Sequence, residues 1–344
     1  MAEDDPPRRT RKGGRGAGVA IGGIVAGIEQ QLFKTTPPVE ELVARGKPTA
    51  PVPAAGGGTL TVSMPGDPMD PPEGAPRSDH VRLAAPGVEV VLDLAVGGRV
   101  ASFRIDGHEL LRTEGYGPIQ WGSYPMAPYA GRIREGQFSF DDRGYTLPIT
   151  HETHAIHGTV LDRPWTSVNE PTDTSAEIRT DLGPDWPFAG RARQRFELSA
   201  DGLTFELAVE ADERMPASIG WHPWFIRRPA GVDTEVAVDL DAEWMFVRDA
   251  AGITTDRLIP APPEPWDDCF AGVRRPPVLR WPGFLDLTVE SPCPFWVVYT
   301  VPQDAVCVEP QTAPPNALNA TPAIVEPGSP LVATMTWGWR RPGA

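Results

Sequence analysis

From about residue 80 onward, hydrophobic and polar positions alternate in short runs typical of β-strands. Gly- and Pro-containing segments separate the runs, and no long amphipathic helical pattern interrupts them. The runs cover residues 88–94, 100–105, 108–111, 137–140, 145–147, 195–198, 203–210, 236–240, 285–289, 295–301, 305–308 and 331–337. This order predicts an all-β fold, with a large antiparallel β-sandwich or barrel-like domain.

A central hairpin is predicted between two polar motifs. Residues 137–140 alternate, residues 141–144 supply the turn, and Tyr145 and Leu147 resume the alternation. Arg132 precedes the hairpin, and a histidine cluster containing His157 follows it. We expect the hairpin to bring Arg132 and His157 towards one mouth, where they would hold a ligand.

The first 78 residues differ from the rest. A basic run at 8–15 precedes a Gly-containing apolar run at 17–28, as in a secretory signal. However, Glu29-Gln-Gln-Leu-Phe-Lys34 stands where a small-residue cleavage site is expected. Residues 36–46 carry helix start and stop signals, and residues 47–77 are rich in Pro, Gly and Ala. We therefore predict a mostly disordered leader over 1–78 with one short helix, followed by a β domain over 79–342.

The charge balance narrows the functional classes. The chain of 344 residues has a formal charge of −15, which argues against a nucleic-acid footprint and against polyanionic substrates. Three cysteines are too few for a disulfide framework, and their odd number suits a reducing compartment, so we expect a cytoplasmic protein. The sequence contains no apolar run long enough to span a bilayer, so we expect no stable membrane insertion. The sequence does not determine the oligomeric state, which is either monomer or homodimer.

Two segments contain candidate acid–base groups. His222 stands in Ile219-Gly-Trp-His-Pro-Trp-Phe225, on a backbone that the following proline keeps extended. It is either a satisfied histidine in an aromatic core or a titrating group beside a stacking surface. Glu309 ends the apolar run Val306-Cys-Val-Glu309, where a carboxylate is either a surface charge or a general base.

Two further polar segments are less distinctive. Asp267 and Asp268 are predicted in a loop, where aspartates usually make turns. His151, His154 and His157 are spaced by three residues, but Pro148 and Gly158 make this segment a loop rather than a zinc-binding helix, so no metal is expected. The sequence has no Gly-rich phosphate loop, no Cys-x-x-Cys and no nucleophile elbow, and we predict no cofactor.

Four motifs, in the same order, resemble those of the aldose 1-epimerase (galactose mutarotase) family. The resemblance covers roughly residues 80–340. The motifs are Pro125-Met-Ala-Pro-Tyr-Ala-Gly-Arg-Ile-Arg134 with His154-Ala-Ile-His-Gly158 and Arg163-Pro-Trp165, then Gly220-Trp-His-Pro-Trp-Phe225, Asp267-Asp-Cys-Phe270 and Glu309-Pro-Gln311.

The resemblance implies a β-supersandwich with an open cleft, and an isomerase that interconverts the α and β anomers of a monosaccharide. It implies that Glu309 is the general base and His222 the general acid. It also implies that Arg132, His157, Asp267 and Gln311 bind the sugar; these six residues are our candidate site. Asp268 stays open as an alternative to Asp267. His151 and His154 have no firm role in the family, and Trp221 and Trp224 depart from many of its members.

The resemblance leads to one geometric expectation and leaves three alternative functions open. We expect the Glu309 carboxylate and the His222 imidazole to face each other across a gap the width of a pyranose. A glycoside hydrolase would instead pair Glu309 with Asp267 as its two carboxylates. A sugar-phosphate epimerase would need extra cations at the cleft, for which Arg134 and Arg163 are the candidates. A non-catalytic carbohydrate-binding protein of the same fold is the third alternative.

Overall fold

A computed structural model describes residues 79–342 of the chain. The predicted leader, with its short helix at 36–46 and its linker at 47–77, lies outside the described residues. Within residues 79–342, no helix is long and apolar enough to cross a membrane.

The larger of two antiparallel sheets has 12 strands. In spatial order they are β1 (His80–Ala85), β2 (Val88–Asp93), β3 (Arg99–Ile105), β5 (Ser123–Met126), β15 (Gly220–Pro223), β24 (Ala305–Gln311), β23 (Phe295–Tyr299), β20 (Asp267–Val273), β18 (Ala242–Arg248) and β19 (Thr254–Pro260), with β4 (His108–Glu109) beside β3 and β16 (Phe225–Ile226) beside β24.

The second sheet has eight strands. They are β10 (Thr166–Ser167), β11 (Ser175–Asp181), β12 (Gly190–Leu198), β13 (Gly202–Ala211), β26 (Leu331–Arg340), β22 (Leu285–Glu290), β21 (Val278–Trp281) and β17 (Ala237–Asp239). Three two-stranded ribbons and two short 3-10 turns complete the fold. They are β6 (Arg132–Ile133) with β9 (Ala155–Ile156), β7 (Gln137–Phe140) with β8 (Arg143–Thr146), β14 (Met215–Ala217) with β25 (Ala323–Val325), η1 (Arg134–Gly136) and η2 (Ala317–Asn319).

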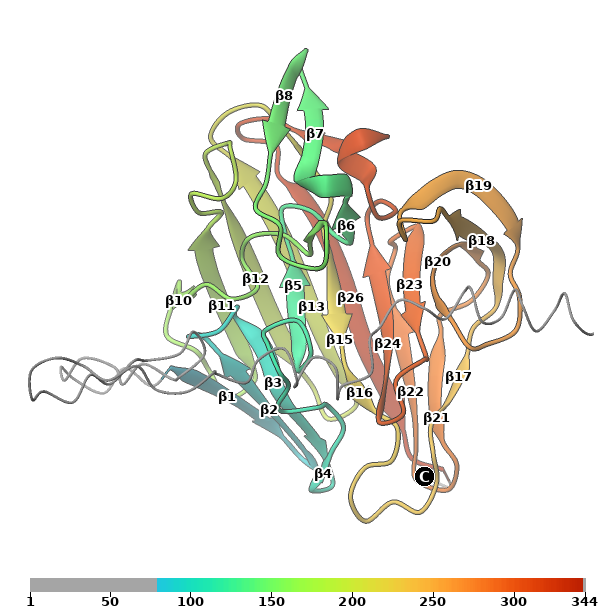
Figure 1. Ribbon diagram of the computed structural model, residues 1–344. Coiled ribbons are helices and arrows are strands. Elements are labelled where there is room, and N and C mark those ends of the chain that lie inside the picture. The colour runs from blue at the N-terminus through green and yellow to red at the C-terminus, as the bar shows by residue number, and fades with distance from the viewer. Residues whose placement is uncertain (1–78, 343–344) are drawn as a thin grey trace, which may run out of the picture. The chain divides into compact units, whose positions relative to one another are not determined.

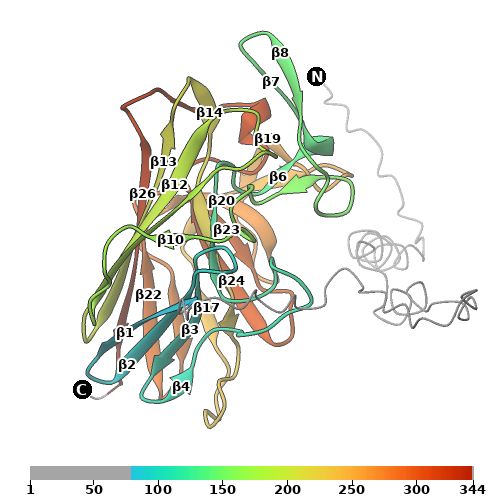
Figure 2. The same ribbon diagram turned by 90° about the vertical axis from the view of Figure 1, so that its left-hand side faces the viewer.

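The two sheets form the two layers of a sandwich, with the β7–β8 hairpin projecting at one end (Figures 1 and 2). Alternation along the strands builds the core between the layers, because every second side chain of a strand faces the same way. In β13, Leu203, Phe205 and Leu207 point inward, and Met335 and Trp337 do so in the neighbouring β26. The predicted all-β sandwich of the supersandwich type is therefore confirmed.

Strand β24 lies near the middle of the 12-stranded sheet and is buried on both faces. Val306 and Val308 belong to the core between the sheets, whereas Cys307 belongs to a second, smaller hydrophobic cluster on the opposite face. Glu309 and Gln311 share that opposite face with Cys307, since they follow it at intervals of two. Glu309 is thus inside a strand, not at the strand end that the sequence suggested.

Most predicted strands are present, and the central hairpin forms between β7 and β8. Its turn is tighter than expected, because only Asp141 and Asp142 lie between the paired residues Phe140 and Arg143. Both turn residues have positive φ, as a two-residue hairpin turn requires. The prediction that Asp267 and Asp268 lie in a loop is wrong, because they begin strand β20 and pair with β23.

Candidate active site

The floor of the candidate site is a row of side chains across five strands of the larger sheet. His222 of β15 pairs with Tyr124 of β5, and the register that joins Gly220 to Gln311 also sets His222 opposite Glu309 of β24. The row continues through Val297 of β23 to Cys269 of β20. Cross-strand neighbours share one face of a sheet, so this register alone brings the imidazole and the carboxylate together.

A second row, two residues along each strand, widens this floor. Asp267, Tyr299 and Cys307 are successive partners across β20, β23 and β24, and Trp224 follows on the β15 side. Trp224, Tyr299 and Asp267 line a cavity of about 180 Å³ together with residues of the first row. This volume lies below the roughly 300–1,000 Å³ typical of sites for drug-sized ligands, and it suits a ligand as small as one sugar.

The walls of the cavity come from separate connections. Ribbon β6–β9 pairs Arg132 with Ile156 and so brings Arg132 beside His157, as the sequence predicted. His157 has a φ of 60°, and the next residue, Gly158, has a φ of 88°. Consecutive left-handed residues are costly except for glycine, and they turn the buried His157 side chain towards the cavity.

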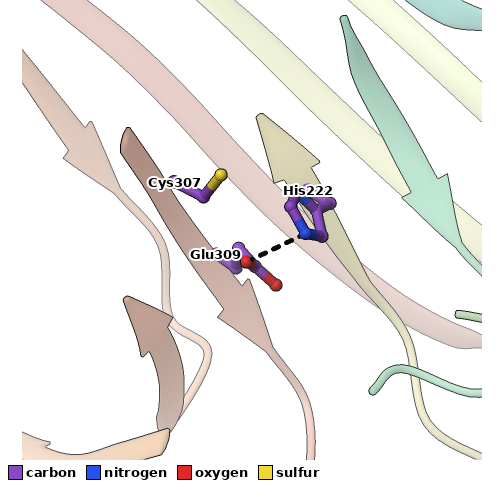
Figure 3. Close-up of side chains that lie close together, drawn as sticks. All are labelled: His222, Cys307 and Glu309. Atoms are coloured by element: carbon purple, nitrogen blue, oxygen red, sulfur yellow. Dashed lines mark ion pairs between the residues drawn. The ribbon is translucent and has the colours of Figure 1, made fainter. Parts of the chain in front are cut away.

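His222 and Glu309 are in direct contact. The Nε2 atom of His222 lies 3.2 Å from Oε1 of Glu309 (Figure 3). Gln311 donates a hydrogen bond of 3.4 Å to Oε2 of the same carboxylate. The expectation of a pyranose-wide gap between the two groups is therefore wrong. A ligand in the cavity would lie over the pair and meet both groups from one side.

Burial favours the uncharged forms of this pair. Glu309 is 1% exposed and His222 is 6% exposed. Burial, together with the negative charge of Asp267, raises the pKa of Glu309 well above its ordinary value, and burial lowers the pKa of His222 well below its own. One proton shared between them, held mainly by Glu309, is the arrangement that these shifts favour.

Aromatic rings fix the orientation of the His222 imidazole. Tyr124 and Trp224 stack with this ring at centroid distances of 4.9 and 5.1 Å, and the His157 ring meets it edge-on at 5.0 Å. The sequence left two interpretations of His222 open, a histidine in an aromatic core and a titrating group beside a stacking surface, and the structure has features of both. The histidine belongs to an aromatic cluster, and one of its edges also lines the cavity.

Asp267 and Asp268 both line the cavity, and Arg248 of β18 joins them. Its Nη1 donates to Asp267 at 2.9 Å, and its Nε donates to Asp268 at 3.1 Å. Sequence reasoning missed Arg248, because nothing in the pattern of β18 sets this arginine apart from those on other strands. The choice between the two aspartates stays a prediction; Asp267 is the one in register with Tyr299 on the floor.

The three evenly spaced histidines do not converge on one point. His154 uses both ring nitrogens: Nδ1 accepts the backbone N–H of Glu135, and Nε2 lies 3.0 Å from the carbonyl oxygen of Ala251. His151 lines the cavity wall, and its pKa is lowered by burial and by Arg132. Of the three histidines, His157 contacts His222, His151 lines the cavity, and His154 makes structural contacts.

Several polar atoms around the cavity are buried without a hydrogen-bond partner. They are Arg132 Nε, His157 Nδ1, His222 Nδ1 and Gln311 Oε1. Buried polar groups are nearly always paired, and each unpaired one costs about 1–3 kcal/mol. A polar ligand or water in the cavity could supply partners for these atoms.

The two extra cations that a phosphate group would need are not at this cavity. Arg134 forms an ion pair with Asp249, and Arg163 lines a separate cleft with Arg179 and Arg191. Among the described residues lining the cavity, the cationic side chains are Arg132 and Arg248, together with histidines. Since Arg248 is already paired with two carboxylates, little positive charge remains for an anionic substrate.

A comparison with known protein families assigns the class of this protein. The family model described as aldose 1-epimerase matches residues 79–337. The chain therefore belongs to the aldose 1-epimerase family.

Solved structures agree at the level of the fold. A galactose mutarotase-like protein from Clostridium acetobutylicum is 20% identical with a TM-score of 0.67, and the match covers 76% of this chain and 95% of the other. A GalM/aldose epimerase homologue from C. elegans is 15% identical with a TM-score of 0.65, covering 76% and 98%. Galactose 1-epimerase from Lactobacillus acidophilus is 17% identical with a TM-score of 0.61, covering 74% and 91%. The search of curated proteins gave no match.

Proposed function

We propose that this protein is an aldose 1-epimerase-type isomerase that interconverts the α and β anomers of a free aldose. The observation that carries the proposal is the buried pair of His222 and Glu309 on the floor of a sugar-sized cavity, in a member of this family. No cofactor is required, because the ring-opened intermediate is a neutral aldehyde.

Mutarotation needs two proton transfers at neighbouring oxygens. One group removes the proton of the C1 hydroxyl while another protonates the ring oxygen, and the ring opens. Rotation about C1–C2 presents the other carbonyl face, and closure reverses both transfers. Because the two oxygens are bonded to the same carbon, an acid and a base that are themselves neighbours can serve both. The contact of 3.2 Å between His222 and Glu309 is compatible with this arrangement.

Glu309 is the proposed base and His222 the proposed acid. The shared proton is favoured on Glu309, so this assignment requires its transfer to His222 over their direct contact. The hydrogen bond from Gln311 and the charge of Arg132 both favour the carboxylate form and support the transfer. The pair exchanges roles when the ring closes, so its single proton is returned in each cycle.

The remaining site residues are proposed to hold the sugar hydroxyls. Arg132 and His157 offer unpartnered nitrogens at the cavity wall, and Asp267 offers a carboxylate that Arg248 keeps in place. Gln311 contacts Glu309 directly, so its role extends to orienting the base.

A neutral monosaccharide is the proposed substrate, and the reaction is placed in the cytoplasm. The scarcity of free positive charge at the cavity disfavours a sugar phosphate. All three cysteines are free and buried, which suits the reducing compartment expected from the sequence.

The test is polarimetry of purified variants with α-glucose and α-galactose. Glu309→Gln and His222→Asn each remove one proton-transfer group, so turnover should fall by about 10²- to 10⁴-fold. Glu197→Gln makes the same chemical change at an exposed position of β12 and should keep the wild-type rate. Circular dichroism checks that each variant is folded.

The same preparations separate the rival functions. Near-wild-type rates in both folded site variants would remove Glu309 and His222 from the mechanism. Release of the aglycone from aryl glycosides would indicate a hydrolase. A faster rate with glucose 6-phosphate than with glucose would indicate a sugar-phosphate epimerase. Sugar binding by calorimetry without anomer exchange above the buffer rate would indicate a binding protein.

A further inference from the structure

Three side chains with metal-binding atoms converge beneath the cavity. Cys307 and Glu309 stand two residues apart on β24 and so project from the same face, and His222 approaches from the neighbouring β15 (Figure 3). One potential ligand atom from each residue lies within 4.8 Å of the other two. The acid–base mechanism uses His222 and Glu309 but gives Cys307 no task.

We propose that His222, Cys307 and Glu309 form a binding site for a divalent cation of the zinc class. This site goes beyond the proposed isomerase activity and does not require it. A thiol, an imidazole and a carboxylate together are typical ligands of zinc, whereas magnesium and calcium prefer oxygen atoms alone.

The spacing of the three groups suits a tetrahedral ion. With zinc–ligand distances of about 2.0–2.3 Å, neighbouring ligand atoms of such a site lie roughly 3.5 Å apart. The His222–Glu309 distance of 3.2 Å is already in this range, and the limit of 4.8 Å leaves shifts of about 1 Å for Cys307, which rotation about χ1 can supply.

The site would have three protein ligands and one open position. His222 and Glu309 line the cavity, so the fourth ligand would be water or a sugar hydroxyl. Cys307 is fully buried, which keeps its sulfur from bulk solvent and directs the ion to enter through the cavity. The thiolate and the carboxylate would together balance the charge of a divalent ion, as burial requires.

A cation at this site would occupy both proposed acid–base groups. It would therefore inhibit the isomerase, and an aldose would compete with it for the same floor. The competition rests on the proposed function, whereas metal binding itself does not.

Cobalt is the probe, because Co²⁺ adopts zinc-like sites and absorbs strongly when a thiolate binds it. The full-length protein, freed of metal with a chelator, is titrated with Co²⁺ in the presence of a non-thiol reductant. We expect saturation at one ion per chain, with a thiolate-to-cobalt band that Zn²⁺ then removes. Cys307→Ser should abolish the band and weaken Zn²⁺ binding by more than about 100-fold.

Cys269→Ser is the matched control, because Cys269 is also buried and lies in the same floor but outside the triad. It should keep the band. His222→Gln is a second test of the metal site if Cys307→Ser does not fold, and it should also weaken Co²⁺ binding. No saturable binding, or a band that survives Cys307→Ser in folded protein, overturns the metal site.

Added galactose separates the two proposals. If it lowers the apparent Co²⁺ affinity, the cation and the sugar share the floor, and both proposals gain support. If the cobalt band behaves as expected but galactose has no effect on it, the metal site stands and the proposed function loses support.

Discussion

Replacement of Arg99 by methionine tests how the loop beside the cavity is held. Arg99 is completely buried in β3, and its guanidinium donates to four backbone carbonyls at 2.7–2.9 Å. The acceptors are Val96, Pro118, Trp121 and Leu161. Burial lowers the pKa of this arginine to about 10. A charge buried without an acidic hydrogen-bond partner is costly, so its retention indicates that the four carbonyls depend on it.

The magnitude follows from two opposing terms. Each carbonyl left without a donor costs about 1–3 kcal/mol, so four of them would cost at least about 4 kcal/mol. The variant no longer buries a cation, which returns several kcal/mol, while it loses the guanidinium's stacking on aromatic rings. Measured losses for broken buried charge networks are about 3–5 kcal/mol, and we expect Arg99→Met to fall in this range.

Urea unfolding followed by tryptophan fluorescence measures the loss, and Arg104→Met is the control. Arg104 lies on the same strand but is exposed, with its ion pair to Glu109 at 3.2 Å, so its replacement should cost less than about 1 kcal/mol. A domain of this size should lose roughly 10 °C in melting temperature with Arg99→Met. The reasoning is refuted if the two variants differ by less than about 1 kcal/mol.

Two further predictions concern strain and pH. Gly158→Ala would set a Cβ 2.0 Å from the carbonyl oxygen of Ala127 and should lower the free energy of unfolding by more than about 3 kcal/mol. Gly107→Ala, also at positive φ but in open space, should lower it by about 1–2 kcal/mol. Thermal unfolding compares the two variants, and equal losses of stability would contradict the steric cause. The pKa of Asp239 is lowered mainly by its hydrogen bond from an arginine, so its charge stabilises the fold above the unfolded pKa of about 3.9 and this stabilisation is lost as pH falls through the lower folded value. The melting temperatures of wild type and Asp239→Asn should therefore converge between pH 5 and pH 2 by about the full difference seen at neutral pH, and a constant difference would be inconsistent with this ion pair.

The fold class could be predicted because alternation with a period of two depends only on the chain itself. Strong runs such as Leu203–Glu210 were clear, whereas β18 and β19 were missed because their residues are exposed or only partly buried and do not alternate between apolar and polar. Asp267 and Asp268 were mistaken for loop residues since aspartate favours turns, yet pairing with β23 overrides that preference.

The candidate site residues could be chosen from the sequence, but their spacing could not. All six chosen residues line one cavity, although their roles stay proposals. The contact between His222 and Glu309 depends on the register of β15 against β24, which joins residues almost ninety positions apart. Strand pairing also determines that Arg248 and Cys307 lie at or beside the site, and the sequence alone does not reveal this pairing. Only the interval of two from Glu309 could have signalled that Cys307 shares its face.

The pair of His222 and Glu309 stands on paired strands at the centre of a sheet, whereas Gln120, Gly252 and Thr254 reach the cavity from hairpins and connections around it. Under the proposed function, these peripheral positions can be varied separately from the two proposed reacting groups. A mutant library restricted to Gln120, Gly252 and Thr254 could be screened for acceptance of new sugars while the reacting centre keeps its geometry. For the proposed isomerase, such a library would alter the choice of substrate without redesigning the chemistry.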